Sequence, residues 1–176
     1  MHAWDEQDAA RTEALLGALP EGVEVVAAYA SRPGEPGTAG LVDALVSTGI
    51  RVLLPVIGRL PGWAWFAGWS DTEPGWGGIP QPIGERLGPT AVAEADLVIV
   101  PCLAIGLDGT RLGTGGGWYD RVLPERREGV PVWALARARE VFETLPTMRH
   151  DVAVDAVVTE AGWTNLGRSA NAAYHG

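Results

Sequence analysis

Residues 96–123 read DLVIVPCLAIGLDGTRLGTGGGWYDRVL and combine an apolar run with a glycine-rich segment. The apolar run at 97–100 is typical of a buried strand, and a loop with four glycines in residues 113–117 follows it. Glycine has no Cβ and adopts positive φ readily, so several backbone N–H groups of such a loop can converge on one anion. We expect a helix to begin at Trp118, with its positive end directed at the same point. The pattern predicts a loop that handles phosphate.

Charged side chains on both sides of the glycines suit the same ligand. Arg111 and Arg121 carry guanidinium groups, which match phosphate geometry, and Asp120 offers a hard oxygen ligand where a phosphate-bound Mg²⁺ would lie. The spacing is not that of a P-loop, because no Lys follows the glycines, nor that of G-x-G-x-x-G after a first strand. Two other readings stay open: the loop is a plain turn, and Asp120 pairs with Arg121.

The same stretch resembles the signature block of the 5-formyltetrahydrofolate cyclo-ligase family, also called methenyltetrahydrofolate synthetase. In that block a strand ends in Val-Pro, and an Arg-Leu-Gly turn, a glycine-rich loop and an aromatic-Tyr-Asp-Arg group follow. Two further stretches agree in the right order. Residues 29–35 (YASRPGE) match the segment in which the family carries a substrate-binding glutamate, and residues 145–160 (LPTMRHDVAVDAVVTE) match its closing Leu-Pro, His-Asp, Val-Asp and Val-Thr pattern. The resemblance covers about residues 23–160.

The resemblance implies a reaction and a set of site residues. The reaction is ATP- and Mg²⁺-dependent cyclisation of 5-formyltetrahydrofolate to 5,10-methenyltetrahydrofolate, with release of ADP and phosphate, through a phosphorylated formyl intermediate. The implied catalytic residues are Arg111, Tyr119 and Asp120, and the implied Mg²⁺ ligands are Asp120 and Asp151. The implied ATP-binding residues are Arg111, Leu112, Gly113, Thr114, Gly115, Gly116, Gly117, Trp118 and Tyr119. The implied substrate-binding residues are Ala30, Glu35, Thr114, Gly115, Gly116, Gly117 and Trp118.

Several positions depart from the family pattern. Family members usually begin with a helix whose Lys or Arg residues touch the ATP phosphates, whereas Arg11 is the one Lys or Arg in the first 30 residues here. The other departures are Cys102 for Gly, Ile105-Gly106 for Phe-Asp, Trp118 for Tyr, Glu140 for Gln, and Gln81 for an acidic residue. Two alternatives therefore stay open: a family member that activates another carbonyl substrate, and a non-catalytic protein that binds folate or nucleotide.

Composition sets the outer limits of these interpretations. The chain has 176 residues, of which 47% are hydrophobic and 20% charged, so we expect a single cyclo-ligase-like domain over residues 1–176. A net charge of −9 argues against nucleic acid or an anionic membrane as a partner. No apolar run approaches the ~20 residues of a membrane span, and the polar, acidic start does not resemble a signal peptide. One cysteine fits a reducing cytoplasm, where we expect a monomer or a weak homo-oligomer.

Alternating strand and helix patterns predict an α/β fold, a three-layer α/β/α arrangement with a mostly parallel, Rossmann-like sheet. The first helix is expected to turn its Glu and Arg residues to the solvent, and Thr38 to cap the second. The tail from Gly162 is polar and is expected to fray. Helices are expected at 5–19, 39–47 and 91–95, with a helical turn or two at 139–144. Strands are expected at 23–30, 50–57, 97–100, 130–135 and 153–158, with a short strand or hairpin at 63–66.

Residues 58–82 are unusually aromatic for a connection between strands. One interpretation is packing beneath a long loop, and the other is a wall that stacks a flat heterocycle such as a pterin. The side chains concerned are Trp63, Trp65, Phe66, Trp69 and Trp76. Other candidates have a plain alternative as well: Glu35 as a solvated loop charge, Asp151 as a turn residue, and Cys102 as a small core residue, which we favour over a nucleophile. We assign His150 no role.

Overall fold

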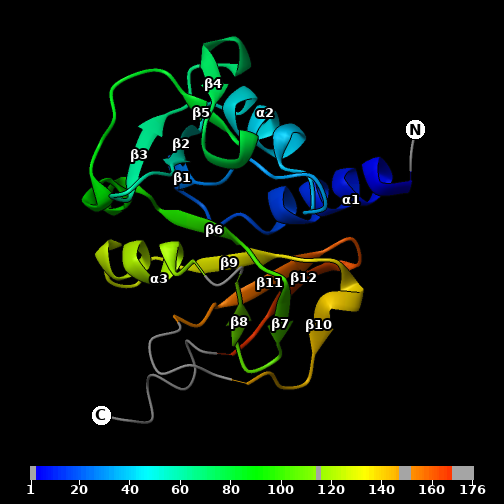
Figure 1. The fold of residues 1–176 in the computed structure, drawn as a ribbon. Coiled ribbons are helices and arrows are strands. Elements are labelled where there is room, and N and C mark those ends of the chain that lie inside the picture. The colour runs from blue at the N-terminus through cyan, green and yellow to red at the C-terminus, as the bar shows by residue number, and fades with distance from the viewer. Residues whose placement is uncertain (1–2, 114–115, 147–151, 168–176) are drawn as a thin grey trace.

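The computed structural model describes residues 3–113, 116–146 and 152–167, and a seven-stranded sheet forms its centre (Figure 1). The strand order is β12-β11-β9-β6-β1-β2-β3. The inner strands pair in parallel, and the strand at each edge is antiparallel to its neighbour. The parallel strands are β1 (Val25–Ala27), β2 (Arg51–Val56), β6 (Leu97–Pro101), β9 (Val132–Leu135) and β11 (Ala156–Thr159), and the edge strands are β3 (Gly62–Trp65) and β12 (Gly162–Asn165).

Helices cover the sheet on both faces, which is why its inner strands are apolar on both sides. Residues Val98 and Ile99 of β6 are both fully buried, yet they belong to different clusters of core side chains. One cluster packs the sheet against α1 (Ala3–Ala18) and α2 (Ala39–Ser47). The other packs it against α3 (Trp118–Val122) and two 3₁₀ turns, Pro89–Glu94 and Leu123–Glu125. The predicted three-layer α/β/α arrangement with a mostly parallel sheet is confirmed.

Two small sheets extend from this centre (Figure 1). One contains β7 (Ala104–Gly106), β8 (Arg111–Leu112) and β10 (Val141–Phe142), and it places Arg111 opposite Ile105. The other is a pair, β4 (Thr72–Pro74) and β5 (Pro80–Pro82), whose connection carries Trp76. In the part of the chain that the structure describes, no helix has the length and apolar character needed to cross a membrane.

Three local predictions hold only in part. The helical turn expected at 139–144 is the 3₁₀ turn Ala138–Glu140, and the strand β10 follows it in place of more helix. The segment after Gly162 does not fray at its start, because β12 pairs with β11 and Trp163 packs against Trp133 with 5.6 Å between ring centroids. The helix expected at 91–95 is the 3₁₀ turn Pro89–Glu94, which begins with proline.

Two polar side chains also differ from expectation. Arg11 was placed on the solvent face of the first helix, but it is only 2% exposed. Thr38 does not cap α2 with its side chain. Its hydroxyl donates to the carbonyl oxygen of Tyr29 at 2.6 Å and accepts from the Ser31 amide at 2.9 Å instead. A fully buried hydroxyl needs such partners, and the closure of the loop after β1 provides them.

Candidate functional site

A cleft of about 370 Å³ opens at the carboxyl ends of β1, β2 and β6. Tyr29 and Ala30 reach it just after β1, Ile57 and Gly58 just after β2, and Cys102 just after β6. Ligands of open α/β sheets bind at this edge, outside the carboxyl ends of the strands. The volume falls in the usual range of small-molecule sites, so this cleft is the candidate site.

The described glycines of the predicted phosphate loop line the cleft. Gly117 directly precedes α3 with a φ of +67°, a left-handed conformation that favours glycine. A Cβ on Gly113 would lie 2.8 Å from Nη1 of Arg111, so glycine at this position leaves space for that guanidinium. Leu112 and Gly116 line the cleft as well, whereas Thr114 and Gly115 lie outside the described residues.

Arg111 is held at the cleft by contacts with three groups. Its Nη1 donates to the carbonyl oxygen of Pro101 at 3.1 Å, and its Nη2 lies 3.7 Å from Oδ1 of Asp120. Its guanidinium lies 5.5 Å from the centroid of the Tyr119 ring. The side chain is buried, and its Nε has no hydrogen-bond partner among the described residues. Asp120 thus pairs with Arg111 and not, as one open alternative had it, with Arg121.

Asp120 also ties α3 to the last part of the chain. Its Oδ1 accepts from the backbone N–H of Val152 at 3.3 Å. Both contacts use the same oxygen, which leaves Oδ2 without a hydrogen bond to any described residue. Mg²⁺ usually takes one or two carboxylates together with substrate phosphates, so the free oxygen suits a metal ligand. Asp151, the other predicted ligand, lies outside the described residues, and the described ones contain no group of three or more His, Cys, Asp or Glu that could hold a metal.

Glu35 faces the same cleft from the loop after β1. Its Oε2 accepts from the backbone N–H of Arg32 at 2.8 Å, and its Oε1 lies 3.4 Å from Nη2 of that arginine. The Glu35 side chain is 14% exposed, so it is a held carboxylate and not a solvated loop charge. Ala30 lines the cleft beside it.

The aromatic segment contributes less to the cleft than predicted. Trp76 lines its mouth and is 60% exposed, with the guanidinium of Arg32 at 5.9 Å from its ring. Trp63 is fully buried and packs edge-on against Trp118 at 5.1 Å. The remaining three pack elsewhere: Trp65 beneath Arg51, and Phe66 against Trp69. Of the two open interpretations, packing beneath the loop therefore holds for these four side chains, which pack in or against the core clusters, while Trp76 lines the cleft and can reach a ligand.

The charge of the cleft is opposite to that of the whole chain. Three arginines (Arg32, Arg111 and Arg121) and two carboxylates (Glu35 and Asp120) line it, although the net charge of the protein is −9. The other titratable side chains there are neutral near pH 7. Burial raises the pKa of Tyr119 and of Tyr29, and burial with the nearby Glu140 carboxylate raises the pKa of the Cys102 thiol to about 12.

Among the polar side chains of the cleft, Tyr29 and Arg32 were missed as site residues. The Tyr29 hydroxyl is buried and has no hydrogen-bond partner within the described ranges. Both residues belong to the quoted segment 29–35, so their place after a parallel strand was the available signal. Cys102, favoured as a small core side chain, is buried and its thiol donates to the carbonyl oxygen of Leu135 at 3.4 Å.

Comparison with known proteins identifies the family. Residues 4–160 match the sequence profile of the 5-formyltetrahydrofolate cyclo-ligase family. The 5-formyltetrahydrofolate cyclo-ligase of Mycolicibacterium smegmatis is 34% identical over 160 residues, which are 88% of this chain and 82% of that protein. The protein of the same name from Escherichia coli is 32% identical over 140 residues, 76% of each chain.

Solved structures agree with the sequence comparisons. The 5,10-methenyltetrahydrofolate synthetase of Aquifex aeolicus matches with a TM-score of 0.78 and 29% identity, over 94% of this chain and 85% of that one. The synthetase of Mycoplasma pneumoniae shares the fold, with a TM-score of 0.67 and 18% identity over 91% of this chain and 90% of that one. The protein is therefore an enzyme and belongs to the 5-formyltetrahydrofolate cyclo-ligase family.

Proposed function

We propose that the protein cyclises 5-formyltetrahydrofolate to 5,10-methenyltetrahydrofolate in a reaction that depends on ATP and Mg²⁺ and releases ADP and phosphate. Family membership supports 5-formyltetrahydrofolate as the substrate. The observation that carries the proposal is the convergence of Glu35, from the loop after β1, with Arg111 and the glycine loop in one cleft. A folate needs a hydrogen-bonding carboxylate and a triphosphate needs a cation with backbone N–H groups, and the reaction needs both sites side by side.

The chemistry explains why a phosphoryl donor is needed. The oxygen of a formamide is a poor leaving group. Transfer of the γ-phosphoryl group to that oxygen gives a phosphorylated formyl intermediate, the N10 amine attacks the activated carbon and loses its proton, and the C–O bond breaks to release phosphate. Phosphoryl transfer asks little covalent chemistry of the protein and depends on positioning and on neutralising charge.

Arg111 and the glycine loop have the properties that this transfer requires. Arg111 and Arg121 are cations at the cleft in a chain of net charge −9, so they supply local positive charge for the phosphates. The backbone N–H groups of residues 113–117 would bind phosphate oxygens. Tyr119 orients the guanidinium of Arg111 by stacking beneath it at 5.5 Å.

Asp120 and Asp151 are the proposed Mg²⁺ ligands. Oδ2 of Asp120 has no hydrogen bond to a described residue, and the pairing of Oδ1 with Arg111 places the carboxylate next to the proposed phosphate site. Mg²⁺ bound there would neutralise phosphate charge in the transition state. The protein's own contribution is to fix the Asp120 carboxylate, which the Val152 amide and Arg111 hold from two sides.

The folate would lie between Glu35 and the aromatic side chains. Glu35 accepts hydrogen bonds, and Arg32 already fixes its orientation. Trp118 lines the inner part of the cleft and Trp76 its mouth, so flat rings of the ligand would find apolar faces at both places. Ala30 leaves room beside Glu35.

The absorbance of the methenyl product gives a direct test. Purified protein is mixed with 5-formyltetrahydrofolate and Mg-ATP, and ATP or Mg²⁺ is left out in the controls. We expect a rise that requires both. A folded protein that gives no rise, while it binds 5-formyltetrahydrofolate in calorimetry, would contradict the catalytic proposal and favour a binding protein.

Asp120→Ala separates the proposed roles. We expect this variant to lose Mg-ATP-dependent turnover by about 100-fold or more, because phosphate charge is no longer neutralised, and to keep its affinity for 5-formyltetrahydrofolate. Turnover is followed by absorbance and affinity by calorimetry. A variant that no longer folds in circular dichroism would show instead that Asp120 is structural.

Two cleft positions favour a second candidate substrate. Trp118 and Cys102 both line the cleft, and both depart from the family pattern. A family member that activates a different carbonyl compound would consume ATP when that compound is present, and it would bind folate weakly. The same calorimetry would detect the weak binding. We also propose that the enzyme acts in the cytoplasm, as a monomer or weak homo-oligomer, where the free Cys102 stays reduced.

A further inference from the structure

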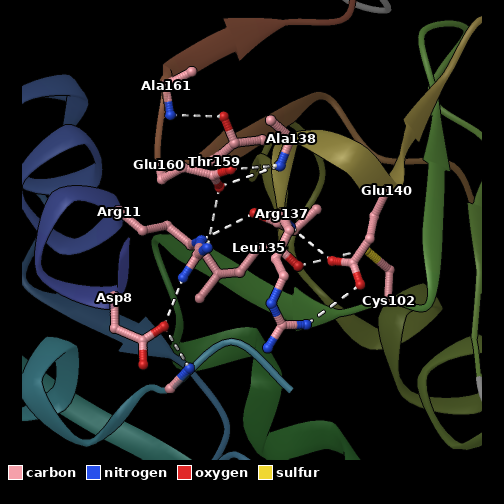
Figure 2. A network of polar contacts seen from close by, with 12 residues as sticks. Asp8, Arg11, Cys102, Leu135, Arg137, Ala138, Glu140, Thr159, Glu160 and Ala161 are labelled. Carbon is pink, nitrogen blue, oxygen red and sulfur yellow. Dashed lines mark hydrogen bonds and ion pairs between the residues drawn. The ribbon is translucent and has the colours of Figure 1, made fainter. Parts of the chain in front are cut away.

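A buried arginine in the first helix joins three separate parts of the fold (Figure 2). Nε of Arg11 donates to the carbonyl oxygen of Ala136 at 2.9 Å, Nη1 donates to Oδ1 of Asp8 at 2.7 Å, and Nη2 donates to Oε2 of Glu160 at 3.2 Å. Glu160 in turn accepts from the backbone N–H of Ala138 at 3.1 Å. The guanidinium thus connects α1 with the chain beyond β9 and beyond β11.

Asp8 carries this connection onward to the loop after β1. The same Oδ1 that binds Arg11 accepts from the backbone N–H of Gly37 at 2.9 Å. A Cβ on Gly37 would clash with Oδ2 of Asp8. Glycine at position 37 therefore allows the carboxylate to approach the loop backbone, and any side chain there would displace it.

The loop that Asp8 binds is also closed at its base. The Ser31 amide donates to the Thr38 hydroxyl at 2.9 Å, and the Thr38 amide donates to the Ser31 hydroxyl at 3.1 Å. Between these ends the loop presents Arg32 and Glu35 to the cleft. Two reciprocal bonds fix the base of the loop. Asp8 adds a contact from α1 to Gly37, on the C-terminal side of the loop.

We propose that Asp8 and Arg11 are positioning residues: they fix the loop of residues 31–38 and so hold Glu35 and Arg32 at the folate side of the cleft. No described residue of α1 lines the cleft, so both act through the loop and not by touching a ligand. The inference rests on the proposed function in one respect, namely that Glu35 binds the folate.

The geometry favours this positioning role of Arg11 over direct contact with the ATP phosphates, the role that the sequence suggested. Family members use cations near the start of the chain to touch the ATP phosphates, and Arg11 is the one such candidate before residue 31 here. Its side chain is 2% exposed, and Nε, Nη1 and Nη2 each already donate to a protein acceptor. A phosphate could reach it only if this buried network came apart, which is costly for a charge.

Asp8→Ala, with Glu6→Ala as its matched control, tests the proposal. Both changes remove one carboxylate from α1, but Glu6 is exposed. Asp8→Ala leaves Arg11 paired with Glu160 and Ala136, so the fold should survive.

We expect the Kd of Asp8→Ala for 5-formyltetrahydrofolate to rise about tenfold and its KM for Mg-ATP to change less than about twofold. Amide hydrogen exchange of residues 31–38 should speed up without ligand. Glu6→Ala should change neither the Kd for 5-formyltetrahydrofolate, nor the KM for Mg-ATP, nor the exchange of residues 31–38.

Gly37→Ala approaches the same contact from the loop side. Its added methyl group should displace Asp8 and weaken folate binding by about as much as Asp8→Ala does. In the double variant the second change should add little, because the clash and the hydrogen bond involve the same carboxylate. Asp8→Asn, which keeps an oxygen acceptor for the Gly37 amide, should recover most of the affinity.

The outcomes are distinct from one another. An unchanged Kd and unchanged exchange in Asp8→Ala would overturn the positioning role, as would an equal rise in the KM of both substrates, which would indicate general loosening. If the unaltered protein does not bind 5-formyltetrahydrofolate, the proposed function fails. The exchange measurement then still decides whether Asp8 fixes the loop.

Discussion

At the scale of single residues, Arg111 shows how a charge is held in a cleft while one of its donors stays without an acceptor. A carbonyl oxygen, a carboxylate 3.7 Å away and an aromatic ring surround its guanidinium, yet Nε keeps no partner in the described structure. A buried donor left without an acceptor costs about 1–3 kcal/mol. A phosphate oxygen would supply that acceptor, which agrees with the role that we propose.

Gly113→Ala should disturb this arrangement without removing any charged group. Its Cβ would lie 2.8 Å from Nη1 of Arg111, so the guanidinium must move away from Pro101 and Asp120. We expect the KM for Mg-ATP to rise by about tenfold, measured by the absorbance assay, and the Kd for folate to stay the same. Gly40→Ala, whose Cβ would meet nothing within 4 Å, serves as the control. Equal kinetics of the two variants would contradict the role of Arg111.

The sequence indicated that some residues share one cleft and misjudged the place of others. Arg111 and Asp120 were predicted from residue types that suit phosphate and Mg²⁺ beside a glycine loop, and Glu35 from the family resemblance and its place after a strand; all three line the cleft, and their roles stay predictions. Arg11 was wrongly predicted to face the solvent. A helical pattern does not show whether buried acceptors are present to pair with a charged side chain, and here Ala136 and Glu160 supply them. These acceptors come from residues 125 and 149 positions away, which local patterns do not report.

At the scale of elements, apolar strands were predictable and polar ones were not. The runs that became β2, β6 and β9 are buried on both faces and stand out as continuous apolar stretches. In β12 all four residues lie at least partly exposed, so its sequence, GWTN, carries no alternation that indicates a strand. Its pairing with β11 depends on the tight turn at Glu160 and Ala161.

Asp96 joins two neighbouring strands at their start and gives a pH-dependent prediction. It accepts from the amides of Glu24 and Val25 at 2.9 and 3.0 Å and from Nη2 of Arg127 at 2.6 Å. Burial by itself raises the pKa of Asp96, but the hydrogen bonds from Glu24, Arg127 and Val25 outweigh it and hold the pKa below its ordinary value of 3.8. The folded protein therefore releases this proton more readily than the unfolded chain.

We accordingly expect Asp96→Asn to lower the free energy of unfolding by about 1 kcal/mol at pH 7. A depressed pKa contributes stability that is complete above the ordinary value of 3.8 and is lost as the pH falls through the lowered value. Urea titrations of both proteins at several pH values would show the difference narrowing below about pH 4. A difference that stays constant down to pH 2 would rule out this cause.

At the scale of the whole molecule, two hydrophobic clusters on opposite faces share one sheet. Neighbouring residues of β6 belong to different clusters, so a loss of packing in one cluster also disturbs strands that contribute side chains to the other. The bond from Arg11 to Glu160 adds a polar link between α1 and the residue that follows β11. This arrangement supports the expectation of a single domain.

Leu15→Ala would test the unity of the fold. Leu15 belongs to α1 and is fully buried, and its truncation should lower the free energy of unfolding by about 2–4 kcal/mol. Because the clusters share strands, circular dichroism and tryptophan fluorescence should report the same single transition in both proteins. Separate transitions for the two probes would show that α1 and its face unfold independently.

Cys102 has a consequence for chemical labelling. It is the protein's one thiol, it is 6% exposed, and it lines the cleft, so a thiol reagent has one site to modify and reaches it from the side on which ligands bind. With a pKa of about 12, the thiolate is scarce at neutral pH and alkylation is slow. The rate of alkylation would therefore serve as a built-in reporter of cleft occupancy: a bound folate or nucleotide would slow it further, and no dye or engineered tag would be needed.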